Sequence, residues 1–261
     1  MKFAPKILHA VCLFSLVSSS HAAISLFAEY RLGEAGSLGA NNLPLDSSGN
    51  NRDLTNQING GSVGVGTTGV FAPGSTAYID TSAATNQGWF GNALTGIADD
   101  NFAFGVFARA SGQGANNGNV FSLGGGGGFK LSLVSNGWGA SQHNVAWISD
   151  VNGNAGTFVA DQWVHLALIR SAGVTEFYID GVAQGANYAG VPTHENAHFS
   201  VDPGGATFFD GHIDEARVVT FTAGESAQDI LNVLQGVPEP SSVSLLALGV
   251  TAFLARRRRN L

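Results

Sequence analysis

Residues 161–168 read DQWVHLAL, and residues 176–182 read EFYIDGV. In the first stretch apolar side chains occupy every second position, and this alternation predicts a strand with one apolar face. The second stretch contains Asp180-Gly181, a dipeptide that favours two-residue hairpin turns because both positions of such a turn adopt positive φ. Together the two stretches predict neighbouring strands and an Asp-Gly hairpin.

Short apolar or alternating runs continue through the body of the chain, with clusters of Gly, Asn, Asp and Ser between them. Clear examples lie at 102–109, 120–123, 129–134 and 212–221. The 261 residues include 36 Gly and only 12% are charged, a composition typical of strands joined by tight turns. Only residues 226–234 have helical spacing. The sequence therefore predicts one all-β sandwich.

Four segments resemble, in the same order, the laminin-G-like jelly-roll domains of the concanavalin A-like class. They are AEYRL at 28–32 with LDSSGN at 45–50, NFAFGVFAR at 101–109, the pair at 161–182, and FDGHIDEARV at 209–218. The resemblance spans nearly the whole body and is loose only in the Gly-rich region 60–74. It implies a two-sheet antiparallel jelly-roll sandwich over residues 23–236.

The first 22 residues have the three parts of a secretory signal peptide. Lys2 and Lys6 give a positive start, and residues 7–17 form an apolar run. The stretch Ser20-His21-Ala22 places small residues at positions -3 and -1 of the expected cleavage site. This pattern predicts export with cleavage near Ala22. An uncleaved membrane anchor would need a longer apolar span.

The C-terminal residues 237–261 have three parts of a different kind. They are Val237-Pro238-Glu239-Pro240, an apolar stretch at 243–255, and four arginines at 256–259. The order resembles a PEP-CTERM sorting signal, whereas a generic tail anchor would not require Pro-Glu-Pro. As a hydrophobic helix the apolar stretch would reach only ~20 Å, short of the ~30 Å hydrocarbon core. Such a segment suits a transient inner-membrane anchor, with the arginines in the cytoplasm.

The sorting resemblance implies processing by an exosortase-type enzyme and delivery to the cell surface or the extracellular matrix. Without the basic residues of the two ends and Glu239, the body keeps 6 basic residues against 18 acidic ones, a net charge of about -12. Nucleic acid and anionic lipid are poor partners for such a body, and divalent cations are better ones. The single cysteine, Cys12, lies in the predicted signal peptide, so no disulfide framework is expected.

The acidic body suggests one structural calcium ion. Calcium takes six to eight oxygen ligands, and the turn of residues 46–50, DSSGN, can present such oxygens. The resemblance implies an ion that joins the opening segment to the closing strand, which nominates Asp46 and Asp214 as metal ligands. In the alternative, Asp46 accepts hydrogen bonds within its own turn.

Several aromatic side chains lie in or beside polar, Gly-rich segments, where a ring can stack on a sugar or pack against the sandwich edge. They are Trp89, Phe90, Trp138, Trp147 and Tyr188. Trp138, in the stretch NGWG, is the leading candidate for a ligand-binding platform.

We expect no enzyme activity and no catalytic residues. Glycanases of related architecture place catalytic carboxylates on a single strand, and Glu176 and Asp180 share a strand face here. Their positions are roughly 13 Å apart at ~3.3 Å per residue, no third carboxylate lies between them, and Asp180 belongs to the turn.

These patterns favour a noncatalytic binding or adhesion module that recognises an extracellular glycan or protein. A structural matrix component without a discrete ligand site is the first alternative, and a glycan-active enzyme is the second. The sequence alone does not separate them, because fold does not determine function.

Overall fold

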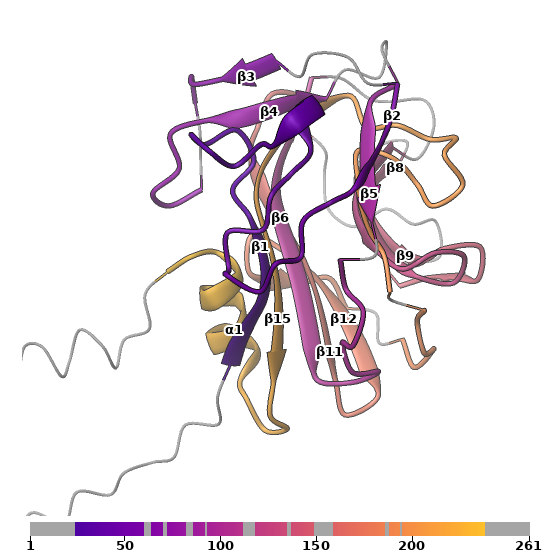
Figure 1. The fold of residues 1–261 in the computed structure, drawn as a ribbon. Coiled ribbons are helices and arrows are strands. Elements are labelled where there is room, and N and C mark those ends of the chain that lie inside the picture. Colours follow the sequence, from indigo (N-terminus) through magenta and orange to yellow (C-terminus); the bar gives the residue numbers. More distant parts are fainter. Residues whose placement is uncertain are drawn as a thin grey trace, which may run out of the picture.

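The protein is described by a computed structural model. It describes residues 24–59, 64–69, 72–81, 86–91, 93–111, 118–134, 137–148, 159–185, 188–193 and 195–237. Two antiparallel sheets pack face to face, with helix α1 (Ala227–Leu234) against the outer side of one of them (Figure 1). A short 3₁₀ turn, η1 (Ala40–Asn42), is the other helical element of the described residues.

The first sheet has the strand order β13-β12-β11-β6-β15-β4-β3, and β1 also pairs with β15. Its strands are β1 (Ile24–Tyr30), β3 (Gly64–Gly66), β4 (Tyr78–Thr81), β6 (Phe102–Ala110), β11 (Val164–Ser171), β12 (Val174–Ile179), β13 (Val182–Ala183) and β15 (Gly211–Phe221). Opening strand β1 and closing strand β15 are therefore neighbours, as expected when a jelly roll closes its chain ends together.

The second sheet has the order β10-β9-β8-β7-β14-β5-β2. Its strands are β2 (Asn56–Ile58), β5 (Gly88–Gly91), β7 (Gly118–Leu123), β8 (Phe129–Val134), β9 (Gly137–Gln142), β10 (Ala146–Trp147) and β14 (Ala197–Phe199). The predicted all-β sandwich is thus confirmed.

The hydrophobic core fills the space between the sheets. Phe104 of β6 meets Phe121 of β7 edge to face with ring centroids 5.3 Å apart, and Phe121 stacks on Phe199 of β14 at 4.4 Å. Because side chains alternate along each strand, the residues between these core positions point outward. The outer face of the second sheet is therefore built from the alternate positions of β5, β14, β7, β8 and β9.

The two local predictions from the opening motif are confirmed. Leu166 to Ser171 of β11 pair with the residues of β12, and Asp180-Gly181 turns the chain into β13 with φ of 49° and 80°. Helix α1 begins after Ser226, whose hydroxyl accepts a hydrogen bond from the Asp229 N–H.

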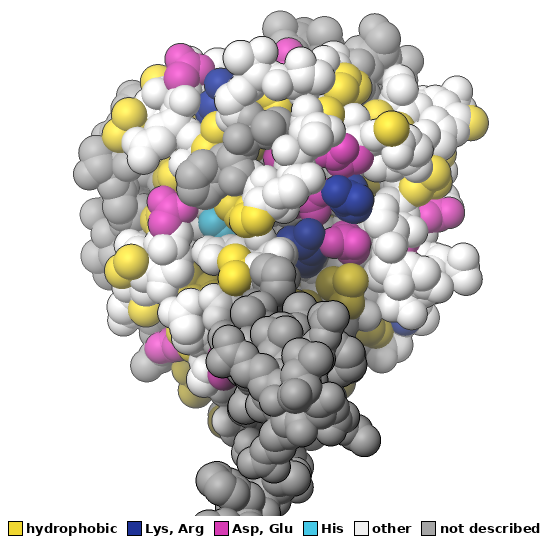
Figure 2. All heavy atoms as spheres, turned by 90° about the vertical axis from the view of Figure 1, so that its left-hand side faces the viewer, with side chains coloured by type: hydrophobic (Ala, Val, Ile, Leu, Met, Phe, Trp, Pro, Cys, Tyr) yellow, Lys and Arg dark blue, Asp and Glu magenta, His cyan; other side chains and the backbone are white. Residues whose placement is uncertain are grey.

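Arg217 of β15 ties the end of α1 to the first sheet. Its guanidinium donates to Glu29 at 2.7 Å, to Glu215 at 2.9 Å and to the carbonyl oxygen of Leu234 at 3.2 Å. Figure 2 shows acidic and basic side chains side by side on this part of the surface. The chain therefore leaves the sandwich at Val237 from the outer side of the first sheet.

No helix within the described ranges is both long enough and apolar enough to cross a membrane. The predicted signal peptide, Pro238 to Pro240 and the predicted hydrophobic helix of the tail lie outside the described residues.

Candidate functional site

One row of directly paired side chains crosses the outer face of the second sheet. Cross-strand partners follow one another from β5 to β10 in the order Phe90, His198, Ser122, Lys130, Ser141 and Trp147. Most of their chain neighbours, such as Phe121, Leu131 and Ile148, belong to the core, so the pleat directs this row outward. The row is polar in the middle and has an aromatic side chain at each end.

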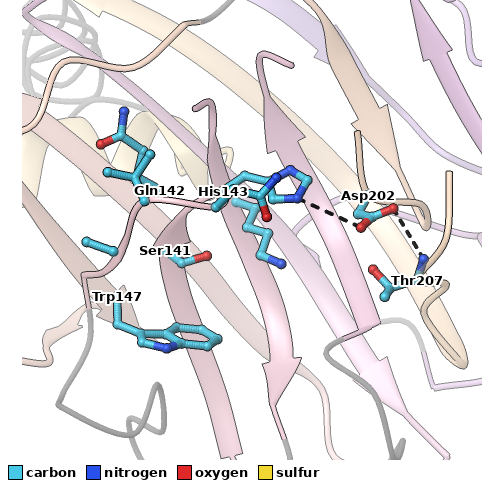
Figure 3. A pocket seen from close by; sticks show the side chains of 10 residues that line it. Ser141, Gln142, His143, Trp147, Asp202 and Thr207 are labelled. Carbon is cyan, nitrogen blue, oxygen red and sulfur yellow. Dashed lines mark hydrogen bonds and ion pairs between the residues drawn. The ribbon is translucent and has the colours of Figure 1, made fainter. Parts of the chain in front are cut away.

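A hollow of about 400 Å³ lies over the end of the row nearest Trp147. It is lined by Lys130, Ser141, Gln142, His143, Asn144, Val145, Ala146, Trp147, Asp202 and Thr207. In Figure 3 the half-buried Trp147 lies on one side, Asp202 and Thr207 on the other, and His143 between them. The volume is within the ~300–1,000 Å³ typical of small-molecule sites.

Asp202 is fixed in the wall of the hollow. Its Oδ1 accepts hydrogen bonds from the backbone N–H groups of Ala206 at 2.8 Å and Thr207 at 3.2 Å. Burial alone would raise the pKa of Asp202, but these hydrogen bonds outweigh burial and lower it. The other oxygen, Oδ2, lies 4.0 Å from Nε2 of His143.

The two histidines of this face are neutral near pH 7. Burial lowers the pKa of His198 to about 4, and burial together with Lys130 lowers the pKa of His143. His198 is 6% exposed and its ring stacks on Phe90 with centroids 5.6 Å apart. Neutral imidazoles offer one donor and one acceptor each, as a hydroxyl-rich ligand requires.

Several polar atoms of this face are buried without a hydrogen-bond partner. Within the described residues they include both ring nitrogens of His198, Nδ1 of His143, and the hydroxyls of Ser132 and Ser141. Buried polar groups are paired in most proteins, and an unpaired one costs about 1–3 kcal/mol. Of these residues, His143 and Ser141 also line the hollow, so their unpaired atoms are the ones nearest to a hydroxyl-rich ligand bound there.

The prediction that Trp138 is an exposed platform is wrong. Its ring is 1% exposed and packs in the core beside Phe209, with ring centroids 6.1 Å apart. Trp138 alternates with the outward Gly139 and Ser141, so it shares the inward face with Ala140. The ring that reaches the hollow is Trp147, five residues after Gln142 in the next strand.

Asp46 makes the contacts of a turn cap. Its carboxylate accepts from the N–H groups of Glu29 at 3.0 Å, Ser48 at 2.9 Å and Arg52 at 3.0 Å, and from the Ser48 hydroxyl at 2.9 Å. A carboxylate has about four acceptor positions, and all four are occupied. Although burial opposes it, this bonding lowers the pKa of Asp46. The structure favours the capping alternative, and Asp46 does not fit a calcium ligand.

Asp214 of β15, unlike Asp46, is not held by a set of close hydrogen bonds. Its side chain is fully buried, and neither carboxylate oxygen has a hydrogen-bond partner of ordinary geometry among the described residues. Burial raises the pKa of Asp214 to about 7. The Ser75 hydroxyl and the Glu215 backbone N–H oppose this shift, whereas the charges of Glu215 and Glu34 add to it. A bound cation would compensate such a buried carboxylate, so Asp214 fits calcium chemistry.

Asp46 and Asp214 do not form a complete metal centre. Over the described residues there is no group of three or more His, Cys, Asp and Glu side chains placed to hold a metal ion. An ion at Asp214 would depend on other oxygen donors, and calcium at this position stays a proposal.

The carboxylates considered for hydrolysis lie on the first sheet. The Asp180 carboxylate accepts from the His165 N–H at 2.7 Å, and the Tyr178 hydroxyl donates to Glu176 at 2.6 Å. Glu176 and Tyr178 line a small hollow beside α1, on the opposite side of the sandwich from Trp147. They therefore contribute nothing to the site on the second sheet.

Two paired sheets, neighbouring chain ends and a hollow on one outer face define a concanavalin A-like sandwich. The family model of the concanavalin A-like lectin/glucanases superfamily matches residues 73–226, and the chain belongs to this superfamily. A second model, the PEP-CTERM protein-sorting motif, matches residues 236–259. Both resemblances seen in the sequence are confirmed, and the motif implies export, sorting through a membrane and processing by an exosortase-type system.

Solved structures with the same fold differ widely in sequence. Domain 4 of AbnA, an extracellular arabinanase from Geobacillus stearothermophilus solved with arabinotriose, is 18% identical with a TM-score of 0.57, covering 81% of this chain and 98% of that one. Trypanosoma rangeli sialidase is 10% identical with a TM-score of 0.52, covering 80% and 32%. No curated protein matches the chain.

The binding domain of Botulinum neurotoxin DC, solved in complex with rat synaptotagmin II, is 12% identical with a TM-score of 0.51. The match covers 82% of this chain and 52% of that one. The chain thus spans about half of the toxin domain and about a third of the sialidase, and these likenesses show the fold alone.

Proposed function

We propose that this protein is an exported, noncatalytic glycan-binding module whose site is the hollow on the outer face of the second sheet. The observation that carries the proposal is the polar row beside Trp147, with buried atoms that lack partners. Sugars combine hydroxyl groups, which would pair with such atoms, with an apolar ring face, which stacks on an aromatic side chain.

The lining of the hollow supports binding rather than catalysis. Glycoside hydrolysis normally uses two carboxyl groups on either side of the scissile bond. Asp202 is the single carboxylate among the described residues of the lining, and its Oδ1 is held by two backbone N–H groups. A protein ligand is the alternative partner, but a small concave polar hollow suits a sugar better than a flat protein surface.

Trp147→Ala should weaken glycan binding about 2- to 10-fold, because a stacked aromatic ring contributes ~0.5–1.5 kcal/mol beyond area burial. The melting temperature should stay within about 1–2 °C, since the ring is only half-buried. A glycan array that includes arabinotriose would select the probe, and calorimetric titration would measure the affinity.

Val182→Ala is the matched control, because Val182 is 64% exposed on the first sheet. It should bind as the parent does. If the parent and the Trp147→Ala variant bind the glycan with equal affinity, the proposed stacking role of Trp147 is ruled out. An array that retains no glycan would instead favour the structural matrix component.

The proposed destination is the cell surface or the extracellular matrix, after transient attachment to the inner membrane. Arg217 holds the end of α1 on the first sheet, whereas the hollow lies on the second. The last described residue, Val237, therefore lies on the opposite side of the sandwich from the hollow.

Deletion of residues 237–261 should move the protein from the cell envelope to the periplasm or the medium. The sorting motif supports this expectation, because its loss would remove both the processing sequence and the apolar segment. Fractionation of cells that produce the parent or the truncated chain would measure the change. If both chains stay in the envelope, the tail is not what sorts the protein.

A further inference from the structure

Lys130 is the only lysine between residues 23 and 236, and the other five basic residues there are arginines. Each arginine donates at least one hydrogen bond: Arg31 to Glu215, Arg52 to the Ala93 carbonyl, Arg109 to His212, Arg170 to the Asp99 carbonyl, and Arg217 to Glu29. Within the described part of the chain, the Lys130 ammonium makes neither a hydrogen bond nor an ion pair. The one unpaired basic group of the body therefore lines the hollow.

The position of Lys130 makes this lack of a partner costly. The residue is only 7% exposed, and burial lowers the pKa of its ammonium group. A charge that is largely removed from water benefits from a partner. The Nζ atom of Lys130 is not among the fully buried unpaired atoms of the described residues, so a group that enters the hollow can reach it. Asp202, which lines the same hollow, opposes part of this shift, but no ion pair joins it to Lys130 among the described residues, so the charge is only partly compensated.

The surroundings of Lys130 supply more donors than free acceptors. The ammonium has three N–H groups, and the hydroxyl of Ser141 directly across the strand pair is also without a partner. Oδ1 of Asp202 already accepts two backbone N–H groups. An incoming anionic group would pair with the ammonium and accept from these donors.

From this geometry we infer that the ligand of the hollow is an acidic saccharide, whose carboxylate or sulfate group forms an ion pair with Lys130. The inference rests on the proposed function and adds the chemical class of the sugar. The body has a net charge of about -12, so its surface repels polyanions in general. Selectivity would therefore depend on a group that enters the hollow, rather than on long-range attraction.

The test compares acidic sugars with neutral forms that keep the same ring. The probes for the exported full-length protein are a galacturonate oligomer and its methyl ester, and a sulfated galactan oligomer and its desulfated form. Measured coupling of close charge pairs at interfaces corresponds to tenfold or more in affinity. The parent should bind one acidic form at least tenfold more tightly than its neutral counterpart, and the pair that shows the preference identifies carboxylate or sulfate.

Lys130→Gln should abolish this preference, whereas Lys130→Arg should keep it. The glutamine variant should also melt at the same or a higher temperature, because it removes a largely buried charge that no ion pair compensates. A merely structural lysine would give the reverse, a lower melting temperature with the preference unchanged. That result would overturn the inference.

Reductive methylation with ¹³C-formaldehyde gives a second readout, since Lys130 contributes the only lysine signal from the body. Loss of one signal in the Lys130→Arg variant assigns it. The acidic probe should shift this signal and raise its titration midpoint, and the neutral probe should do neither. If acidic and neutral probes bind the parent equally, the acidic class is wrong while glycan binding stands; if neither binds and the array retains no other glycan, both proposals fail.

Discussion

Trp138→Ala should lower the free energy of unfolding by about 3–5 kcal/mol, the usual cost of removing a buried Trp or Phe ring. The ring is 1% exposed and lies beside Phe209 in the core, so its loss leaves a cavity between the sheets. Since a domain is stable by only ~5–15 kcal/mol, the variant should melt well below the parent. Urea unfolding of the parent and the variant measures the difference.

The matched comparison is Trp147→Ala, which removes the same side chain from a half-buried outer position. Compared with Trp138→Ala, this variant should lower the free energy of unfolding much less and weaken glycan binding more. If Trp138→Ala unfolds at the same urea concentration as the parent but loses glycan binding, Trp138 is the platform that the sequence suggested, and its assignment to the core is wrong.

Asp214→Asn should stabilise the calcium-free protein above about pH 7 and have little effect near pH 4. The folded pKa of Asp214 is about 7, whereas an unfolded aspartate titrates near ~3.9. The pKa of Asp214 is higher in the folded protein than in the unfolded chain, so the protonated carboxyl stabilises the folded state. This contribution is present in full below the unfolded pKa. This contribution is lost as the pH rises through 7, and at ~1.4 kcal/mol per pKa unit the loss approaches about 4 kcal/mol.

Calorimetry with chelator from pH 4 to pH 8 measures how the stability of the parent and of Asp214→Asn changes with pH. Calcium at ten times its Kd should return about 1.4 kcal/mol to the parent at pH 8 and nothing to the variant. If the stability of the parent and of the variant changes with pH in the same way, a group other than Asp214 titrates. If the melting transition of the parent changes with neither calcium nor chelator, the proposed ion at Asp214 is ruled out.

The fold was predictable because its evidence is local. Alternation in residues 161–168 and the Asp180-Gly181 turn depend on neighbouring residues, and the structure keeps both. Alternation in residues 129–134 also directs Lys130 outward, so this residue of the site could have been found from the sequence.

The rest of the site depends on contacts across the fold. Asp202 lies in a loop far along the chain from His143, and only the packing of the second sheet brings them to 4.0 Å. Trp147 is in a strand of two residues, which is too short for a periodic pattern. Trp138 was misassigned because its glycine-rich surroundings resemble a loop, whereas Gly137 and Gly139 are strand residues.

The structure of the protein in complex with a glycan selected on the array tests glycan binding at the second sheet most directly. We expect the sugar in the hollow between Trp147 and Asp202, with an acidic group at Lys130. A sugar bound at a rim of the sandwich, or on the first sheet beside Tyr178, would contradict the proposed site.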